Sequence, residues 1–420
     1  MRIVETMSTT KTPTDRFSYV GGLFSETATR DYFEAQYVDW DQRKVYVVFG
    51  AQPAGTIRND HDGAFDWNLA IIEELFATVE SIPSQAWSLE LGEGFRLVST
   101  DRLPPSGDFR CAPYHPHLSD SRMLSNARTV TRAHLVEDER LGWRVDKCHY
   151  ITESMIRKDV IFKYDFIPTS LPNSWDEIHT HYQLSGHPLI VSFDRVVVDE
   201  VEGRIVGFTT EFIPGGALDS MVSPQFTLRH FQQLTDVIDD LNIGYRVQHC
   251  DVHPRNILLD LASDSIRLLD FNYAERIDVN PRSDRNDEAG VAFTLYELAT
   301  HDYELRGRHA QYPSVQAILN KTDWPLHSES CIRGDIAGFR RHLDHWLRLR
   351  TEPEPQITTS YTKIQDLPPL PLAPRIPSYD ETGSPTEPLH GWGIMEQLKD
   401  SAYLSNGDPL HGTLPCVQDS

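Results

Sequence analysis

The spacing of apolar residues predicts an α/β module near the N-terminus. Residues 44–50 (KVYVVFG) predict a strand and residues 87–98 (WSLELGEGFRLV) a hairpin. Between them, apolar residues recur at helical spacing over residues 69–82, which predicts an amphipathic helix. We assign residues 17–100 to this module. Because it carries no recognisable catalytic constellation, a structural or partner-binding role is its simpler interpretation.

The pattern changes at about residue 129. Short segments rich in β-branched residues now predict strands, and a long amphipathic helix follows them, opened by Pro224 and closed by Gly244. The predicted strands are 160–163 (VIFK), 189–193 (LIVSF), 196–198 and 205–208. Since the strands come first and the helices later, this segregation favours an α+β architecture in two lobes over a doubly wound sheet.

The segments on either side of this region have the composition of connections and tails. Residues 101–130, with PPSGD and PYHPHLSDS, predict a linker. Residues 351–420 are rich in Pro, Thr, Ser and acidic residues, and we expect them to form a disordered tail. Within this tail, residues 368–375 (PPLPLAPR) have the composition of a polyproline helix for an SH3 or WW partner, although a plain linker is the simpler interpretation.

Composition narrows the classes of function. The 420 residues include 62 acidic and 39 basic side chains, a formal net charge of -23, so neither nucleic acid nor a membrane surface is an expected partner. A phosphorylated ligand can still bind where magnesium neutralises its charge. The 5 cysteines are scattered and form no C-x-x-C pair, which argues against a disulfide framework or a zinc site. With no signal-peptide pattern and no apolar run of membrane-spanning length, we expect a cytoplasmic or nuclear location.

One segment carries residues suited to phosphoryl transfer, a reaction that needs a carboxylate near the acceptor hydroxyl, oxygen ligands for Mg²⁺ and a cation on the ATP phosphates. Residues 249–260 (HCDVHPRNILLD) place Asp251 five positions before Asn256. This spacing resembles the catalytic loop H-R-D-x-x-x-x-N of the protein-kinase superfamily, with His249 matching and Cys250 in place of arginine. The resemblance implies that Asp251 accepts the hydroxyl proton and that Asn256 holds a metal ion.

Further segments resemble the same superfamily. Asp270-Phe271-Asn272 is similar to the D-F-G element, which implies that Asp270 binds Mg²⁺; asparagine tolerates a positive φ, so the turn can survive the loss of glycine. Lys163 corresponds to the strand lysine that grips the α- and β-phosphates, and Glu177 to its ion-pair partner. Residues 187–191 (HPLIV) resemble the HPNIV that follows that helix in kinases, which favours Glu177 over Asp176.

The remaining matches concern the adenine and the packing of the catalytic loop. Residues 210–218 (TEFIPGGAL) resemble the hinge between two lobes, and residues 286–300 resemble the helix after the activation segment, with Asp287 anchoring the catalytic loop. The residues implied to contact or enclose the adenine are Leu141, Val145, Glu211, Ile213 and Leu258.

The resemblance covers residues 131–350 and implies a bilobal protein-kinase-like fold, with a small β-rich N-lobe, a helical C-lobe, and ATP and Mg²⁺ as cofactors. The sequences of these motifs are most similar to those of divergent kinase-like proteins of filamentous fungi. The similarity includes EDERLGWRVD at residues 137–146.

The chain departs from the family in three places. The phosphate-covering G-x-G-x-x-G is missing, because residues 141–145 supply Gly142 alone. Asp270 and Asp287 lie only 17 positions apart with no A-P-E ending, which leaves little room for the platform on which protein kinases bind a peptide. His253 stands where protein kinases usually carry lysine. A histidine is less reliably cationic at neutral pH, and H-x-D-x-H-P-x-N-I-L also resembles aminoglycoside and choline phosphotransferases.

Three interpretations of function therefore stay open. The leading one is an ATP- and Mg²⁺-dependent kinase acting on protein Ser/Thr hydroxyls, with Asp251 and His253 as catalytic residues. The second is the same chemistry on a small-molecule hydroxyl, favoured by the short activation segment and His253. The third is a pseudokinase scaffold that binds partners, which the lost glycines favour and the retained polar residues oppose.

Overall fold

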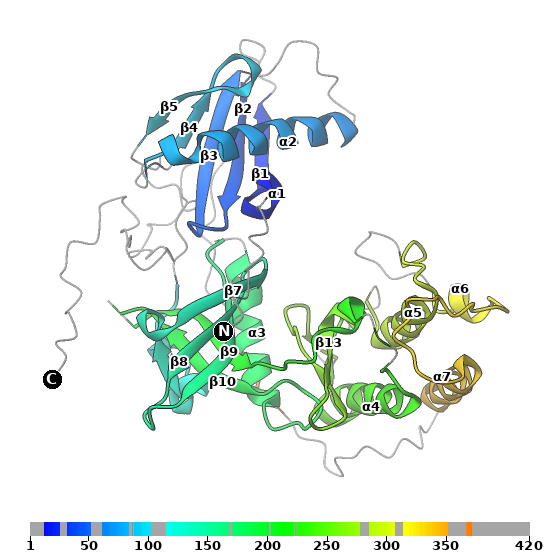
Figure 1. The fold of residues 1–420 in the computed structure, drawn as a ribbon. Helices are drawn as coiled ribbons and strands as arrows, with labels where there is room; N and C mark the ends of the chain where they lie inside the picture. The colour runs from blue at the N-terminus through cyan, green and yellow to red at the C-terminus, as the bar shows by residue number, and fades with distance from the viewer. Residues whose placement is uncertain are drawn as a thin grey trace, which may run out of the picture.

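The computed structural model describes residues 12–25, 32–51, 61–83, 86, 88–101, 115–167, 170–200, 203–221, 223, 225–277, 285–306, 314–351 and 367–371. Their architecture is mixed α and β, as the sequence predicts (Figure 1). The helices are α1 (Pro13–Arg16), α2 (His61–Thr78), α3 (Leu171–Leu184), α4 (Leu228–Asp239), α5 (Asp287–Thr300), α6 (Gln316–Leu319) and α7 (Ile336–Thr351). A π-helix, Asp240–Tyr245, continues α4.

The strands are β1 (Phe17–Ser25), β2 (Tyr32–Asp39), β3 (Lys44–Ala51), β4 (Ser88–Leu91), β5 (Leu97–Asp101), β6 (Thr129–Thr131), β7 (Val136–Gly142), β8 (Val145–Ile151), β9 (Arg157–Tyr164), β10 (Phe193–Val198), β11 (Ile205–Glu211), β12 (Val247–Gln248), β13 (Ile257–Asp260), β14 (Ser265–Leu268) and β15 (Glu275–Arg276). Short 3-10 helices cover Val79–Ser81, Glu93–Phe95, Leu118–Asp120, Met123–Asn126, Arg132–His134, Leu218–Ser220 and Pro254–Asn256.

The N-terminal module is a sheet in the order β1-β2-β3-β4-β5 with α2 across one face (Figure 1). β3 pairs parallel with β4 and the other neighbours pair antiparallel. Ile71, Ile72 and Leu75 of α2 are buried in one cluster with Tyr37 and Val48 of the sheet, because the helical spacing of these apolar residues puts them on one face. The predicted strand, helix and hairpin all form.

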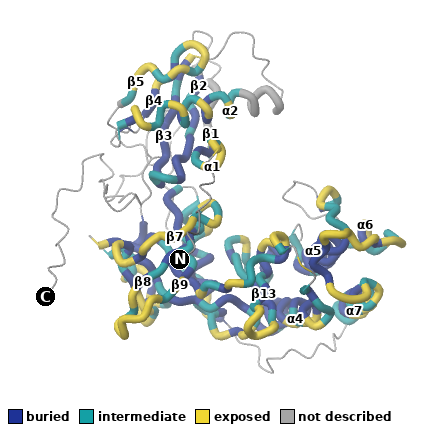
Figure 2. Tube along the Cα trace, in the orientation of Figure 1, coloured by how far each residue is buried: buried dark blue, intermediate teal, exposed yellow. Residues whose placement is uncertain are grey.

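A second sheet has the order β6-β10-β11-β9-β8-β7. The N-terminal module contributes to the apolar core of this sheet, since Val38, Trp40 and Val45 from the β2–β3 hairpin are buried with Val160 and Phe162 of β9. Figure 2 shows the buried lower end of β3 pointing toward the second sheet. The N-terminal module therefore packs onto the second sheet through a shared apolar cluster.

Helix α3 covers part of this second sheet. Trp175 and Ile178 of α3 are buried with Val196, Ile205 and Phe208 from β10 and β11. The apolar residues of α3 therefore fix its rotation, and with it the direction of the polar side chains between them.

The third part of the molecule is mainly helical. α4, α5 and α7 enclose one large apolar cluster that also contains Ile257 and Leu259 of β13. Thr227 accepts a hydrogen bond from the backbone N–H of His230 and so caps α4, which corresponds to the predicted long amphipathic helix. The helix begins at Leu228 and not at Pro224 as predicted, and Pro224 lies outside the described residues. Gly290 lets α5 approach closely, because a Cβ there would lie 2.9 Å from Cβ of Val252.

One predicted strand is wrong over most of its length. Residues 189–192 are not part of β10, which begins at Phe193. Ile190 instead forms an isolated bridge with Leu268, and the N–H of Val191 donates to the Leu268 carbonyl at 3.0 Å. A short apolar run is compatible with any buried extended backbone, so periodicity could not separate the two cases.

Two segments predicted to be linker or tail contain ordered, packed residues. Residues 115–131 add β6 to the second sheet and bury Leu124, so the linker prediction for 101–130 does not hold at its C-terminal end. In the tail, residues 367–371 pack against the folded body. There the Trp175 indole N–H donates to the Pro371 carbonyl at 3.1 Å, and Leu367 is buried. The predicted linker at 102–114 and tail at 352–366 and 372–420 lie outside the described residues.

Within the described residues, none of the helices combines the length and the apolar composition that a membrane crossing needs.

Candidate active site

Three charged side chains from distant parts of the sequence meet beneath the second sheet. Lys163 on β9 donates hydrogen bonds to Glu177 on α3 and to Asp270 Oδ1, the latter at 2.6 Å. Burial by itself lowers the pKa of Lys163, but the Asp270 and Glu177 carboxylates outweigh it and raise that pKa. Lys163 is therefore a permanent cation held between two acidic groups.

The two acidic partners respond differently to this environment. Burial raises the pKa of Glu177 to about 7, although Lys163 opposes the rise. Burial also acts to raise the pKa of Asp270, yet here Lys163 prevails and the pKa is lowered. Asp270 thus remains an anion at neutral pH, whereas Glu177 titrates near neutrality. Neighbouring acidic groups whose pKa values are shifted in opposite directions are typical of functional sites.

Asp251 lies in a loop rich in donors. The Asn256 side-chain N–H donates to the Asp251 carboxylate at 2.7 Å and to its backbone carbonyl at 2.9 Å. Arg255 donates to the same carboxylate at 2.7 Å, and Arg285 approaches its other oxygen at 3.5 Å. The carboxylate is almost fully buried, with 4% of the residue exposed, and two guanidinium groups compensate its charge.

Asp287 at the start of α5 organises the backbone of this loop. Its carboxylate accepts from the N–H groups of His249 at 2.9 Å and Cys250 at 2.8 Å, and from the side chain of Asn242 at 2.8 Å. The His249 ring accepts from the Asp251 N–H at 3.2 Å, and its other nitrogen lies 2.9 Å from the Leu269 carbonyl. Backbone groups that would otherwise be buried without partners are thereby satisfied.

Two residues of the site have a backbone conformation that side chains disfavour. Cys250 has φ 61 and Asp270 has φ 70, both in the left-handed region. We expected the positive φ at Asn272, where kinases carry glycine, but it occurs at Asp270 instead; aspartate shares with asparagine a tolerance for this region. Such conformations persist only where surrounding contacts hold them, and they cluster at functional sites.

A series of tilted and edge-to-face ring contacts connects the loop at residues 249–256 to α3. The Phe271 ring lies 4.9 Å from that of His249 and 5.5 Å from that of His181, which in turn contacts Phe208 on β11 at 5.6 Å. Burial lowers the pKa of His181 to about 4, so this ring is neutral and packs as an apolar group. A shift of α3 would therefore be felt at Phe271 and at the neighbouring Asp270.

A cavity of about 200 Å³ opens beside Lys163, Glu177 and Asp270. Val145, Lys163, Glu177 and Asp270 line it, together with Arg144. The other residues implied to hold adenine lie apart from this cavity: Leu141 is half exposed at the end of β7, Glu211 is exposed at the end of β11, Ile213 is buried beyond it, and Leu258 is half-buried on β13. The cavity thus brings together Lys163, Glu177, Asp270 and Val145 of the predicted site, whereas Asp251, His253 and Asn256 are not among the residues that line it.

His253 is a poor cation. Burial, followed by Arg306 and Arg255, lowers the pKa of His253 to about 2. Its Nε2 lies 4.0 Å from a carboxylate oxygen of Glu297, and its buried Nδ1 has no hydrogen-bond partner among the described residues. Glu297 is itself paired with Arg306 at 2.8 Å. Any stabilisation of negative charge by His253 at neutral pH must therefore come from a neutral ring.

The side chains of Asp270, Asn256 and Asn272 carry oxygen atoms of the kind that bind a hard cation such as Mg²⁺. Asp270 uses Oδ1 for Lys163, and Asn256 uses its amide N–H groups for Asp251, so each retains a side-chain oxygen. A third oxygen, Oδ1 of Asn272, is buried without a partner among the described residues. Carboxylate and amide oxygens are the ligands that Mg²⁺ prefers. The residue types that the sequence resemblance assigns to the metal are therefore among those that Mg²⁺ prefers.

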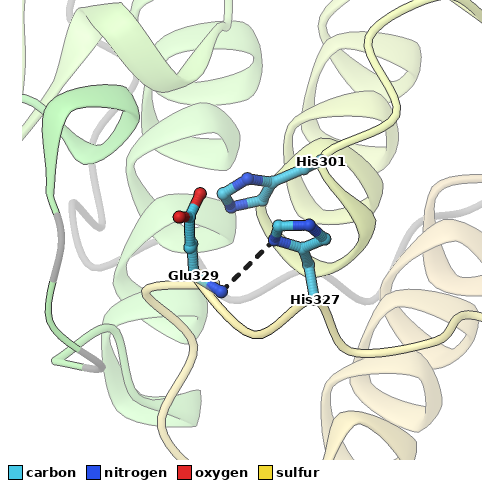
Figure 3. A group of neighbouring side chains, drawn as sticks. All are labelled: His301, His327 and Glu329. Atoms are coloured by element: carbon cyan, nitrogen blue, oxygen red, sulfur yellow. Dashed lines mark hydrogen bonds between the residues drawn. The ribbon is translucent and has the colours of Figure 1, made fainter.

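A different group of side chains has the composition of a transition-metal site. Among the described residues, His301, His327 and Glu329 each offer a ligand atom within 4.8 Å of the others (Figure 3). The two rings stack at 4.3 Å, and Nδ1 of His327 accepts the Glu329 N–H at 3.2 Å. Since that bond already occupies a ring nitrogen and two of the three residues are exposed, we assign no metal here.

Sequence reasoning missed the arginines of the site. Arg144, Arg255 and Arg285 all approach the predicted residues, the first at the cavity and the others at Asp251. Arg255 was accessible from the sequence, being four positions after Asp251 in a tight loop. Nothing in the local pattern distinguishes Arg144 or Arg285 from surface arginines, because only the tertiary fold brings them to the site.

A scan of protein-family models and a search of curated proteins found no match to this chain.

Proposed function

We propose that residues 131–350 form a bilobal protein-kinase-like domain that transfers the γ-phosphoryl group of ATP to a protein hydroxyl. The N-lobe would be the second sheet with α3, and the C-lobe the helical part with α4, α5 and α7. The observation that carries the proposal is the contact of Lys163 with both Glu177 and Asp270, which are separated from it by 14 and 107 residues. A cation held in this way between two acidic groups at a cavity suits nucleotide phosphates.

Each residue has a defined task in this proposal. Lys163 binds the α- and β-phosphates, and Glu177 holds the lysine in place. Asp270 and Asn256 hold Mg²⁺, which supplies charge neutralisation for the phosphates. Asp251 orients the acceptor hydroxyl and takes its proton, while Asp287 and His249 keep the loop backbone in position.

A small-molecule hydroxyl is the second candidate substrate. The observation that favours it is the burial of His253 near Arg306 and Arg255, which lowers its pKa, so that it does not replace the cation that a protein-kinase lysine would supply. The short span between Asp270 and Asp287 favours it as well, since little chain is left to bind a peptide.

A non-catalytic role is the third candidate. Arg255 donates to the Asp251 carboxylate at 2.7 Å and Arg285 lies 3.5 Å from it, so both compete with an incoming hydroxyl for the same oxygens. A protein that binds nucleotide and partners without transfer is compatible with this pairing. The retained lysine, asparagine and carboxylates argue for chemistry.

The first test is the thermal midpoint of the full chain with ATP, in the presence and absence of Mg²⁺. Ligand at one hundred times its dissociation constant adds about 2.7 kcal/mol of stability. We expect a magnesium-dependent rise that Asp270→Ala abolishes. No rise at millimolar ATP would remove the basis for the proposal.

The second test separates the three candidates. Asp251→Asn keeps the size and most hydrogen bonds of the side chain, so it should retain MgATP binding and lose transfer by about 100-fold or more. Labelled phosphate on protein supports the first candidate, and phosphate on a metabolite alone supports the second. MgATP binding with no transfer to either substrate class supports the third.

A further inference from the structure

Arg144 occupies the tight turn between β7 and β8, at the place where the sequence lacks the expected glycines. Its carbonyl accepts the Tyr164 N–H at 3.1 Å, and the next residue, Val145, pairs with Lys163 across the strands. The backbone of Arg144 is thus fixed next to Val145, the strand partner of Lys163. Its side chain lines the same cavity as Lys163 and Asp270.

The guanidinium of Arg144 is anchored on one side only. One of its terminal nitrogens donates to Asp165 Oδ2 at 2.6 Å, and Asp165, with 2% of the residue exposed, also accepts from Ser174 at 2.8 Å and from the Ile167 N–H at 2.9 Å. Asp165 is the sole acceptor that the described residues give this guanidinium. An arginine has five N–H donors in a rigid fork, so most of them remain for a ligand in the cavity.

The charges around the cavity need a second cation if a polyphosphate is to enter. Asp165, Glu177 and Asp270 face Arg144 and Lys163, and the carboxylates raise the pKa of Arg144 against the opposing effect of burial, so it stays charged. Lys163 already serves two carboxylates. A planar guanidinium forms paired hydrogen bonds with phosphate, which an ammonium cannot.

The N-terminal module holds this turn in place. The rings of Trp143 and Trp40 stack at 5.5 Å with an interplanar angle of 11°, and Arg140 donates to Asp41 at 2.6 Å and to the Trp40 carbonyl at 2.7 Å. Nearby, the buried Arg43 donates to Glu137 at 2.7 Å. A turn clamped in this way cannot close over a ligand as a glycine-rich loop does, but it presents a side chain in a fixed position.

We propose that Arg144 binds the phosphate groups of a nucleoside triphosphate in this cavity, in place of the backbone amides of a glycine-rich loop, and that the N-terminal module positions it. This inference rests on the proposed function, because it assigns a further phosphate-binding residue to the same site.

The test uses Arg144→Gly in the full chain. Arg144 has φ 62, a conformation that glycine adopts without strain, so this variant removes the side chain and preserves the turn. Calorimetry measures the affinities for MgATP, AMP and adenosine. Hydrogen bonds to a charged group contribute about 1.5–3 kcal/mol, so MgATP should bind roughly 10- to 100-fold more weakly, with adenosine unchanged and AMP affected less.

Two further variants make the result decisive. Arg157→Gly removes an arginine that is half exposed and paired with Asp138 and Asp159, and it should leave MgATP binding unchanged. Arg144→Lys keeps a cation beside Asp165 and protects the fold if the glycine variant is unstable; it should bind MgATP more weakly than wild type and more tightly than Arg144→Gly.

The failure of this inference is distinguishable from failure of the proposed function. If wild type binds MgATP and both Arg144 variants bind it equally well, Arg144 is not a phosphate ligand and the kinase-like site stands. If wild type binds neither MgATP nor adenosine, the proposed function falls and the role of Arg144 falls with it.

Discussion

The loop at residues 249–256, which contains Asp251, and the β7–β8 turn are held by different means. The loop is positioned by the helical part of the molecule, through Asp287 on α5, and by hydrogen bonds between Asp251 and Asn256. The turn is positioned from outside, by the stacking of Trp143 on Trp40 from the N-terminal module. Asp251 is buried, whereas Trp143 has 63% of its surface exposed.

This difference shows two ways of obtaining a rigid site. Buried polar groups specify the loop because any alternative backbone would leave donors without acceptors. The turn has hydrogen bonds of its own, from Arg140 to Asp41 and Trp40 and from Arg144 to Asp165, and it also depends on a ring contact with a segment about one hundred residues earlier. Damage to the loop should therefore lower the stability of the helical part of the molecule. Damage to the contact with the N-terminal module should mainly affect the turn and its Arg144.

The largest expected effect comes from removing the anchor of the loop. Asp287→Ala leaves the N–H groups of His249 and Cys250 and the Asn242 amide buried without their acceptor. We expect the free energy of unfolding to fall by about 3 kcal/mol, measured by urea denaturation. Asp287→Asn retains one acceptor oxygen and should lose less. Equal stability of wild type and the alanine variant would show that the loop does not depend on this carboxylate.

A smaller effect should appear in the pH dependence of stability. Burial lowers the pKa of His253 to about 2 from its ordinary 6.5, so below pH 6.5 the unfolded chain takes up a proton that the folded chain does not. The stabilisation is complete above pH 6.5 and is lost as pH falls, by about 1.4 kcal/mol per pH unit for one proton.

His253→Gln isolates this contribution, since all other titrating groups are common to both proteins. Urea denaturation at pH 7, 6 and 5 should give a steeper loss of stability for wild type than for His253→Gln. Parallel curves would mean that the pKa of His253 is the same in the folded and unfolded chains, and that burial does not lower it.

The smallest effect is expected at the turn. A double-mutant cycle with Trp40→Ala and Trp143→Ala should give a coupling free energy of about 1 kcal/mol, the usual value for an aromatic pair. Trp143→Ala alone should also weaken MgATP binding by a few-fold if the stack positions Arg144. A coupling of zero would indicate that the two rings lie together without holding the turn.

Much of the architecture follows from local patterns. The helical spacing over residues 69–82 and the alternating strands around VIFK correspond to α2 and β9, since burial on one face imposes its period on the sequence. Residues 189–192 and 367–371 were not predictable in the same way. The first is an extended segment that bridges to Leu268. The second is a proline-rich stretch whose carbonyl groups accept hydrogen bonds from Trp175, Gln183 and Arg276, side chains that only the fold brings to it.

The sequence by itself determined the residue types of the site and their order, because the spacing of Asp251 and Asn256 and the position of Asp270 after a strand are local features. The sequence resemblance also implied the pairing of Lys163 with Glu177. Only the tertiary structure decided that Lys163 also meets Asp270, that burial lowers the pKa of His253, and that Arg144 reaches the cavity from a turn held by the N-terminal module. The physical reason is that the chemistry of a side chain depends on its residue type alone. Burial, charge pairing and stacking depend on which distant segments the fold brings into contact.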